Sequence, residues 1–166
     1  MLQNGQTILQ VAFYNNDIEC IKKLIENGAD VTKIYLFYLY NAECIKILIE
    51  NGIDINKPNL CGQTILGILC TKNNIECVKI LIENGADVNK KSNNYTHLFR
   101  ACYHNNIECV KILIDNGAYD LTSFIRGCNQ NNKECIEYFL NKNISIKNTK
   151  YHNCLLYTSP SPRDGL

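Results

Sequence analysis

The sequence lacks the features that mark several large classes of protein. Its charges show no excess of one sign, because 17 Lys and Arg stand against 16 Asp and Glu, for a net charge of +1. This balance gives no electrostatic reason to expect a nucleic acid or an anionic membrane as the main partner. Long hydrophobic runs are also missing: the longest, Ile34 to Tyr40, has seven residues, too few for a transmembrane helix. The first residues show neither a basic start nor an apolar stretch, so we predict no secretory signal.

The chain has the composition of a folded protein and contains many cysteines. Its 166 residues suit one domain, and a hydrophobic content of 46% is enough to build a core. Ten cysteines would, by number alone, fit a secreted disulfide scaffold. Their placement indicates something else, because half of them belong to an internal repeat.

The repeat is marked by the dipeptide Glu-Cys, which occurs five times. The separations between its cysteines are nearly equal in the middle of the chain and shorter for the first and last pair: Cys20, Cys44, Cys77, Cys109 and Cys135. Four of these cysteines follow a threonine at one constant separation, and the threonines are Thr7, Thr64, Thr96 and Thr122. Repetition at such a period is the signature of a solenoid.

Each unit is predicted to form two short helices. In the segment from Ile75 to Glu83, apolar residues recur at helical spacing and charged residues occupy the opposite face. A glycine follows where a left-handed cap is needed, so we assign structural caps to Gly28, Gly52, Gly85 and Gly117, with Asn143 in the last unit. Asparagines make the turn between the helices, at Asn16, Asn73, Asn105 and Asn131.

These units resemble the ankyrin repeat, a β-turn finger followed by an antiparallel helix pair. The family pattern runs Gly-x-Thr-Pro-Leu-His near the start and Asn-Gly-Ala-Asp-Val-Asn at the end. The third unit here gives Gly62-Gln-Thr64-Ile-Leu66-Gly67 and ends Asn84-Gly-Ala-Asp-Val-Asn89. The resemblance covers about residues 4–147. It implies a mainly α fold, an ankyrin-type solenoid of stacked antiparallel helix pairs with β-turn fingers.

We expect about five units, two of them shortened. Their predicted boundaries are 1–28, 29–52, 53–85, 86–117 and 118–147, with 148–153 as the end of the native sequence. Units two and five lack most of a finger. The family's motif histidine is replaced by Gln10, Gly67, Phe99 or Ile125. Its hydrogen bonds to the neighbouring turn are therefore expected to be absent, which lowers the expected stability.

The two ends of the sequence are predicted to be unnatural. The first unit begins at Met1 without a polar capping repeat, so we expect either that an upstream part is missing or that Met1 is an internal start. Residues 154–166 carry no repeat pattern, and Cys154 to Asp164 resembles a translated transposase adaptor from sequencing libraries. We interpret 154–166 as a non-native or disordered tail, with a natural Ser/Pro-rich tail as the alternative. The rest is rich in Asn, Ile and Lys, and similar arrays are typical of large DNA viruses and AT-rich protists.

The cysteines are predicted to be core residues. Three pairs lie seven residues apart because each helix of a unit contributes one inward position: Cys70 with Cys77, Cys102 with Cys109, and Cys128 with Cys135. Free cysteine packs as a small buried hydrophobe, whereas structural zinc needs four ligands at short separations. We therefore expect no metal, no cofactor and reduced thiols.

No catalytic constellation emerges from the sequence. A Cys–His nucleophile pair would need His97 or His104 to orient a specific thiol, and spacing suggests no carboxylate partner for either. The glycines are caps and turns, with no phosphate-binding loop. We predict that the protein is not an enzyme and takes no small-molecule substrate.

The run Ile34 to Tyr40 holds four aromatic residues and allows two interpretations. It could form a contact patch, because tyrosine is enriched at interfaces. We favour a buried face made of Ile34, Phe37 and Tyr38 in a shortened first helix, with Tyr35 or Tyr40 partly exposed.

The ankyrin resemblance implies a protein partner that binds the concave surface formed by finger tips and first helices. The matching positions are Gln6, Tyr14, Asn15, Leu60, Gln63, Thr71, Lys72, Ser92, Asn93, Tyr95, Tyr103, His104, Asn129 and Gln130. This surface is polar with interspersed tyrosines, which suits a modest interface, although each residue could equally be an ordinary solvated one.

We therefore predict an intracellular, cytoplasmic protein-interaction module, in the host cytoplasm if the source is a virus, with neither a nucleic-acid nor a membrane partner. One alternative is a substrate-recruiting fragment of a larger adaptor, such as a ubiquitin-ligase component. The other is a thiol or zinc-binding protein.

Overall fold

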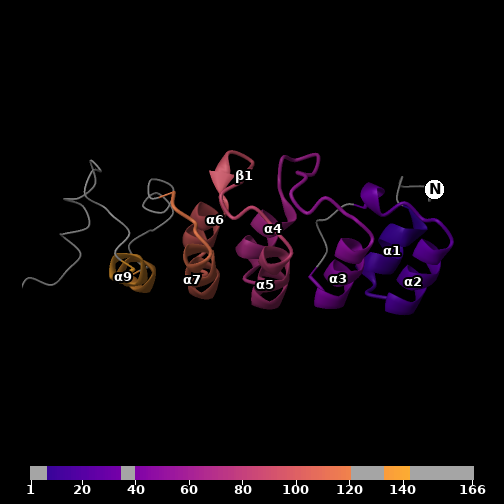
Figure 1. The fold of residues 1–166 in the computed structure, drawn as a ribbon, viewed down its shortest axis with the longest axis horizontal. Helices are drawn as coiled ribbons and strands as arrows, with labels where there is room; N and C mark the ends of the chain where they lie inside the picture. Colours follow the sequence, from indigo (N-terminus) through magenta and orange to yellow (C-terminus); the bar gives the residue numbers. More distant parts are fainter. Residues whose placement is uncertain (1–6, 35–39, 121–132, 143–166) are drawn as a thin grey trace, which may run out of the picture.

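The chain forms an elongated stack of short helices, shown in Figure 1. The structure, a computed structural model, describes residues 7–34, 40–120 and 133–142. The predicted tail and the residues 148–153 before it lie outside the described part. None of the described helices is both long and apolar enough to span a membrane.

Three helix pairs are complete within the described residues. They are α1 (Ile8–Tyr14) with α2 (Ile18–Glu26), α4 (Ile65–Lys72) with α5 (Ile75–Glu83), and α6 (His97–Tyr103) with α7 (Ile107–Asp115). Two more second helices are α3 (Ala42–Glu50) and α9 (Lys133–Asn141). Residues 35–39 and 121–132 lie before them, so the shortened first helices predicted there fall outside the described residues. The mainly helical stack confirms the predicted fold class.

The recurrent threonine is the N-cap of each first helix. The hydroxyl oxygens of Thr7, Thr64 and Thr96 each accept a hydrogen bond at 3.2 Å from the backbone N–H three residues later. Such a cap satisfies one of the N–H groups that a helix start leaves without a partner. The constant separation between threonine and cysteine thus reflects the fixed distance from the first cap to the start of the second helix.

The glycine after each second helix adopts the left-handed conformation that the sequence predicted. The φ angles of Gly28, Gly52, Gly85 and Gly117 lie between +75° and +88°. At Gly85 the closing bonds run from Gly85 N to Ile82 O at 3.0 Å and from Ala86 N to Leu81 O at 2.9 Å. These bonds satisfy the last carbonyls of α5 and end the helix.

The turn between the two helices of a pair also needs a left-handed residue. Asn16, Asn73 and Asn105 have φ angles of 54°, 56° and 57°. Asparagine tolerates this conformation better than most residues that carry a Cβ, which explains its recurrence at the predicted turn positions. Asn131 lies outside the described residues.

The second helices form one continuous row, with α2, α3, α5, α7 and α9 each in contact with the next (Figure 1). The first helices α4 and α6 pack above this row and against each other. Fully buried side chains such as Ile21, Leu48, Leu81 and Leu113 fill the space between helices. A repeat buries its apolar face only against its neighbours, so the core runs along the whole stack.

The fingers project from the side of the stack opposite the second helices (Figure 1). In the fourth unit the finger is a hairpin of β1 (Lys91–Ser92) and β2 (Tyr95–Thr96), which pair antiparallel. Its turn residues Asn93 and Asn94 have φ angles of 54° and 66°, as a tight hairpin turn requires. The backbone N–H of Asn93 donates to the carbonyl of Gly62 at 2.6 Å, so this finger contacts the preceding one.

Two asparagines join successive loops at the base of the fingers. Asn56 donates from its side-chain amide to the carbonyl of Gly85 at 3.2 Å and accepts from the N–H of Asp87 at 2.9 Å. Asn89 makes the same pair of bonds with Gly117 and Tyr119 at 3.0 and 3.3 Å. One side chain thus satisfies two backbone groups of the next loop, which sets the register between neighbouring units.

The aromatic run is described only at its ends. Ile34 is buried, as the favoured interpretation requires, and Tyr40 is 40% exposed. Phe37, Tyr38 and Tyr35 lie outside the described residues, so the choice between a buried face and a contact patch stays a prediction.

Candidate functional site

Most of the predicted partner-binding residues lie on one side of the stack, on the fingers and first helices. Tyr14 and Asn15 end α1, Thr71 and Lys72 end α4, and Tyr103 and His104 end α6. We name as the finger–helix surface its exposed residues Tyr14, Asn15, Leu60, Lys72, Asn93, Tyr95, Tyr103 and His104, with half-buried Gln63, Thr71 and Phe99. Gln6, Asn129 and Gln130 lie outside the described residues.

A row of stacked aromatic rings is the most regular feature of this surface. Phe99 and Tyr103 are four residues apart on α6, which places them one above the other on the helix surface. Tyr95, in β2, comes four residues before Phe99 and stacks on it. The ring centroids of Tyr95 and Phe99 are 4.4 Å apart, and those of Phe99 and Tyr103 are 5.8 Å apart, with nearly parallel planes. We call these three residues the aromatic ladder. Its two tyrosines are 49% and 60% exposed.

The ladder continues into His104, whose ring meets the edge of the Tyr103 ring at a centroid distance of 5.3 Å. His104 is exposed and forms the C-cap of α6. The predicted surface residues Tyr103 and His104 are therefore in contact with each other. Sequence reasoning missed Phe99, although its spacing of four residues from both tyrosines is visible in the sequence.

The buried position of Ser92 contradicts the prediction that this residue contacts a partner. Its relative exposure is 0%, because its hydroxyl faces the start of α4 and accepts a hydrogen bond at 3.0 Å from the backbone N–H of Thr64. Its carbonyl accepts from the Arg100 guanidinium, with a distance of 2.7 Å from Nη2. Ser92 is therefore a structural residue that fixes the base of the finger.

Gly67 provides the space for this arrangement. A Cβ at Gly67 would lie 2.5 Å from Ser92 Oγ and 3.3 Å from His97 Cδ2. Gly67 occupies the place of the family's motif histidine in the third unit. Its missing side chain leaves room for two side chains from the fourth unit.

His97, which is not the motif histidine, makes hydrogen bonds between two units that the sequence did not predict. Its Nε2 lies 2.8 Å from Thr64 Oγ1 and its Nδ1 lies 3.1 Å from the carbonyl of Val88. A carbonyl can only accept, so Nδ1 carries the proton, and the Thr64 hydroxyl donates to Nε2. His97 stands at the motif proline position, which is why the motif pattern alone did not assign these bonds to it.

The buried position of His97 keeps its ring neutral. Loss of hydration lowers the pKa of His97 from 6.5 to about 4, an effect only partly opposed by the bond to the Val88 carbonyl and the charge of Asp87. The role of His97 is therefore structural: it joins the third unit to the fourth.

Arg100 supplies a cation beside the ladder that sequence reasoning did not select. Its guanidinium lies 6.0 Å from the centre of the Tyr95 ring while it holds the Ser92 carbonyl. Partial burial lowers the pKa of Arg100, mainly through lost hydration, but arginine stays charged in proteins. Tyr95 is thus in contact with both Phe99 and Arg100.

Four of the five Glu-Cys cysteines confirm the core-packing prediction, and two of them add a contact between units. Cys44, Cys77, Cys109 and Cys135 are fully buried. The Cys44 and Cys109 thiols lie 3.7 and 3.6 Å from the Oδ1 atoms of Asn16 and Asn73, in the inter-helix turns of preceding units. Each such thiol fills the space above a neighbouring turn and donates a weak hydrogen bond to it.

Burial also makes the Cys44 and Cys77 thiols poor nucleophiles. Loss of hydration, helped by the nearby Glu76 carboxylate, raises the pKa of Cys77 to about 11. Cys20 is half-buried and Cys61 is exposed on the third finger. Within the described ranges, no group of three or more His, Cys, Asp and Glu side chains could hold a metal ion.

Comparison with known proteins identifies the repeat. The family model of ankyrin repeats in three copies matches residues 34–125, and the single ankyrin repeat matches residues 4–34. No curated protein matches the sequence. Among solved structures, the crystal structure of the human ASB11 ankyrin repeat domain is similar, with a TM-score of 0.70 and 23% identity over 84% of this chain and 71% of that one. The chain belongs to the ankyrin repeat family.

Proposed function

We propose that this chain is a non-enzymatic protein-interaction module that binds its partner through the finger–helix surface. Ankyrin repeats are generally protein–protein interaction modules. The observation that carries the proposal is the aromatic ladder, in which exposed Tyr95 and Tyr103 stack on Phe99 between them. Ordinary solvated side chains are not expected to stack in such a regular row.

The ladder has the properties of an interface anchor. Aromatic side chains contribute large contact areas with few rotatable bonds, so they lose little entropy on binding. Stacking and the nearby Arg100 hold Tyr95 in place before a partner arrives. Leu60, on the preceding finger, is 88% exposed and offers a further apolar contact, and the two fingers are joined by the bond from Asn93 N to Gly62 O.

The test is the double variant Tyr103→Ala with His104→Ala. Both side chains are exposed, so the variant should fold, which circular dichroism can check. We expect the affinity for a captured partner protein to fall at least tenfold, because central aromatic residues dominate interface energies. The matched control is Lys46→Ala with Lys79→Ala, two exposed residues of second helices. Unchanged binding in the first variant and weakened binding in the control would place the partner on the other face.

A substrate-recruiting fragment of a larger adaptor, such as a ubiquitin-ligase component, would use the same surface and is a narrower form of this proposal. Sequencing the uninterrupted genomic reading frame distinguishes a stand-alone interaction module from an adaptor fragment, because an adaptor needs a further domain. A cytoplasmic location is part of the proposal, since free thiols persist in reducing compartments.

A further inference from the structure

Acidic residues are absent from the segments that build the finger–helix surface. Residues 7–16, 56–73 and 89–105 contain no Asp or Glu, whereas the last two carry Lys57, Lys72, Lys90, Lys91 and Arg100. The chain as a whole has a net charge of only +1, so this is a separation of charge and not an overall excess.

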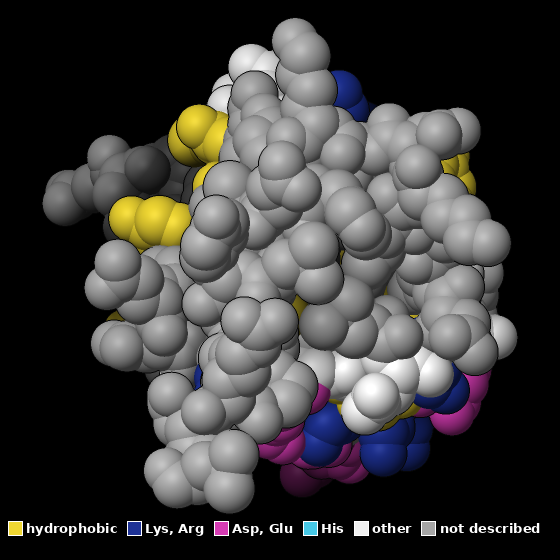
Figure 2. All heavy atoms as spheres, turned by 90° about the vertical axis from the view of Figure 1, so that its left-hand side faces the viewer, with side chains coloured by type: hydrophobic (Ala, Val, Ile, Leu, Met, Phe, Trp, Pro, Cys, Tyr) yellow, Lys and Arg dark blue, Asp and Glu magenta, His cyan; other side chains and the backbone are white. Residues whose placement is uncertain are grey.

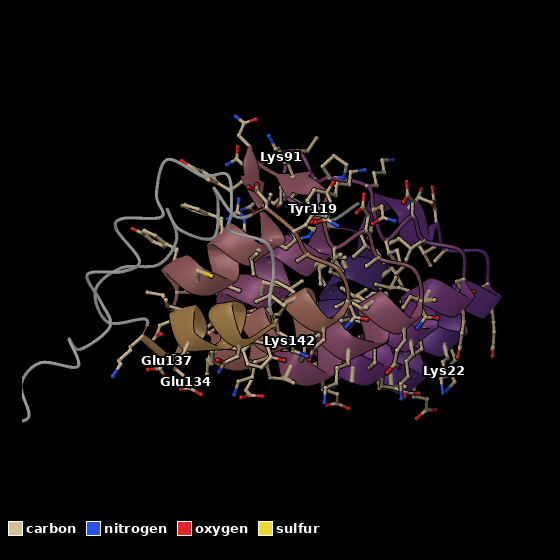
Figure 3. All side chains as sticks on the ribbon, turned by 60° about the vertical axis from the view of Figure 1, so that its left-hand side comes forward. Lys22, Lys91, Tyr119, Glu134, Glu137 and Lys142 are labelled. Atoms are coloured by element: carbon tan, nitrogen blue, oxygen red, sulfur yellow. The ribbon has the colours of Figure 1, made fainter. Side chains whose placement is uncertain are left out.

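The second helices hold most of the opposite charge. Figure 3 shows Glu134 and Glu137 on the second-helix side of the stack and Lys91 on the finger side. On the face that Figure 2 shows, the visible acidic side chains gather at the lower edge, beside Lys and Arg side chains. Several acidic residues there are paired with lysines, for example Glu134 with Lys111 at 3.3 Å and Asp115 with Lys142 at 2.6 Å.

The aspartates nearest the fingers serve the local backbone. Asp54 and Asp87 lie at the base of the third and fourth fingers, and each carboxylate accepts the N–H of the asparagine two residues later at 2.9 Å. The five cations of the finger and first-helix segments, by contrast, form no ion pair with any other residue that the structure describes. Their charge is therefore available to a partner.

The ladder presents ring edges and hydroxyls to this partner more than ring faces. Phe99 stacks on Tyr95 on one side and on Tyr103 on the other, so the faces between the rings are covered. The edge of an aromatic ring is its positive part, and a tyrosine hydroxyl donates hydrogen bonds. Both favour carboxylate groups.

We infer that the finger–helix surface of the third and fourth units binds an acidic segment of a protein partner, with its Asp and Glu side chains next to Lys72, Lys91 and Arg100 and along the edge of the aromatic ladder. This inference rests on the proposed function and adds the chemistry of the partner. Electrostatic complementarity of this kind sets specificity and association rate, and the ladder supplies the apolar contact.

A single-stranded nucleic acid is the competing anionic ligand, and the geometry favours it less. Bases bind by stacking on free aromatic faces, and the faces between the ladder rings are already occupied. Nucleic-acid domains also carry a strong excess of positive charge, which a net charge of +1 does not provide.

The experiment selects ligands for the full chain from a random peptide library displayed on phage and measures binding of the synthetic peptides by fluorescence anisotropy. We expect the selected peptides to be enriched in Asp and Glu, and their affinity to fall as salt is raised. Lys72→Glu with Lys91→Glu should weaken binding at least fivefold. The matched control is the charge reversal Lys46→Glu with Lys79→Glu on the second helices, which should change binding less than twofold.

The outcomes separate this inference from the proposed function. Neutral or basic peptides that lose affinity in Tyr103→Ala but not in the charge reversals would overturn the acidic partner and leave the surface assignment intact. Peptides that bind equally well to all these variants would overturn both. An oligothymidylate that binds more tightly than the peptides, with loss in Lys72→Glu and Lys91→Glu, would show that the anionic ligand is a nucleic acid.

Discussion

Thr64 and His97 meet across the boundary between the third and fourth units, with 2.8 Å between Thr64 Oγ1 and His97 Nε2. Thr64 is also the N-cap of α4, because its oxygen accepts the N–H of Gly67. One hydroxyl therefore caps a helix in one unit and holds a ring from the next. This contact positions α6, which carries Phe99 and Tyr103 of the aromatic ladder.

The first prediction is a pH dependence of stability that comes from His97. Its pKa is about 4 in the folded chain and 6.5 when unfolded, so the unfolded chain binds more protons between these values. The contribution of neutral His97 is fully present above pH 6.5, and the free energy of unfolding falls by up to about 1.4 kcal/mol per pH unit below it. Urea unfolding of the full chain at several pH values measures this slope.

One variant identifies the group responsible for that slope. His97→Gln should remove much of it, because no imidazole remains to bind the proton. Equal slopes in the parent chain and in His97→Gln would show that other groups cause the acid sensitivity.

The second prediction concerns the space at Gly67. Alanine normally stabilises a helix interior by up to about 1 kcal/mol relative to glycine. Here Gly67→Ala should destabilise the chain by about 2 kcal/mol, because its Cβ would lie 2.5 Å from Ser92 Oγ and 2.8 Å from Ser92 Cβ. Ser92→Gly removes both atoms, so the double variant should lose less than the sum of the two single variants in thermal unfolding. Additive losses would contradict the predicted clash.

The third prediction tests the left-handed cap after α5. Gly85 has a φ of +88°, and a Cβ there would meet nothing within 4 Å, so only the backbone conformation resists substitution. We expect Gly85→Ala to cost about 1 kcal/mol and Gly85→Asn to cost less, because asparagine tolerates this region. Chemical denaturation compares the two variants, and equal losses would show that the cost is not conformational.

The fourth prediction concerns thiol reactivity. In a chain in which Cys128 and Cys154, outside the described residues, are replaced by Ser, a disulfide reagent should react rapidly with exposed Cys61 and more slowly with half-buried Cys20. The buried thiols of Cys44 and Cys77 should react only after unfolding, because burial raises the pKa of both, that of Cys77 to about 11. Rapid native-state modification of Cys77 would contradict its place in the core.

The sequence predicted the helices, their caps and the role of the cysteines because these depend on local or periodic signals. Gly85 and Asn73 adopt left-handed conformations that few other residues tolerate, and Cys109 recurs on an inward helical position. Each signal is visible within one unit. The prediction of the fold class succeeded for this reason.

The sequence could not predict contacts that depend on two units at once. Ser92 looks like an exposed finger residue, and only the absence of a side chain at Gly67, in the preceding unit, lets it become buried. His97 forms hydrogen bonds with Thr64 of the preceding unit and with Val88, and no motif within its own unit indicates them. The aromatic ladder was partly visible, since its members are four residues apart, but Phe99 was assigned only as a departure from the motif.

Site-specific photo-cross-linking tests the central claim that the partner binds the finger–helix surface. A photoreactive phenylalanine analogue at Tyr103 places the probe on the ladder, and the same analogue at Lys79 places it on an exposed second-helix position. With a partner protein bound to the full chain, we predict cross-links from position 103 and few from position 79. Cross-links from position 79 alone would contradict the claim.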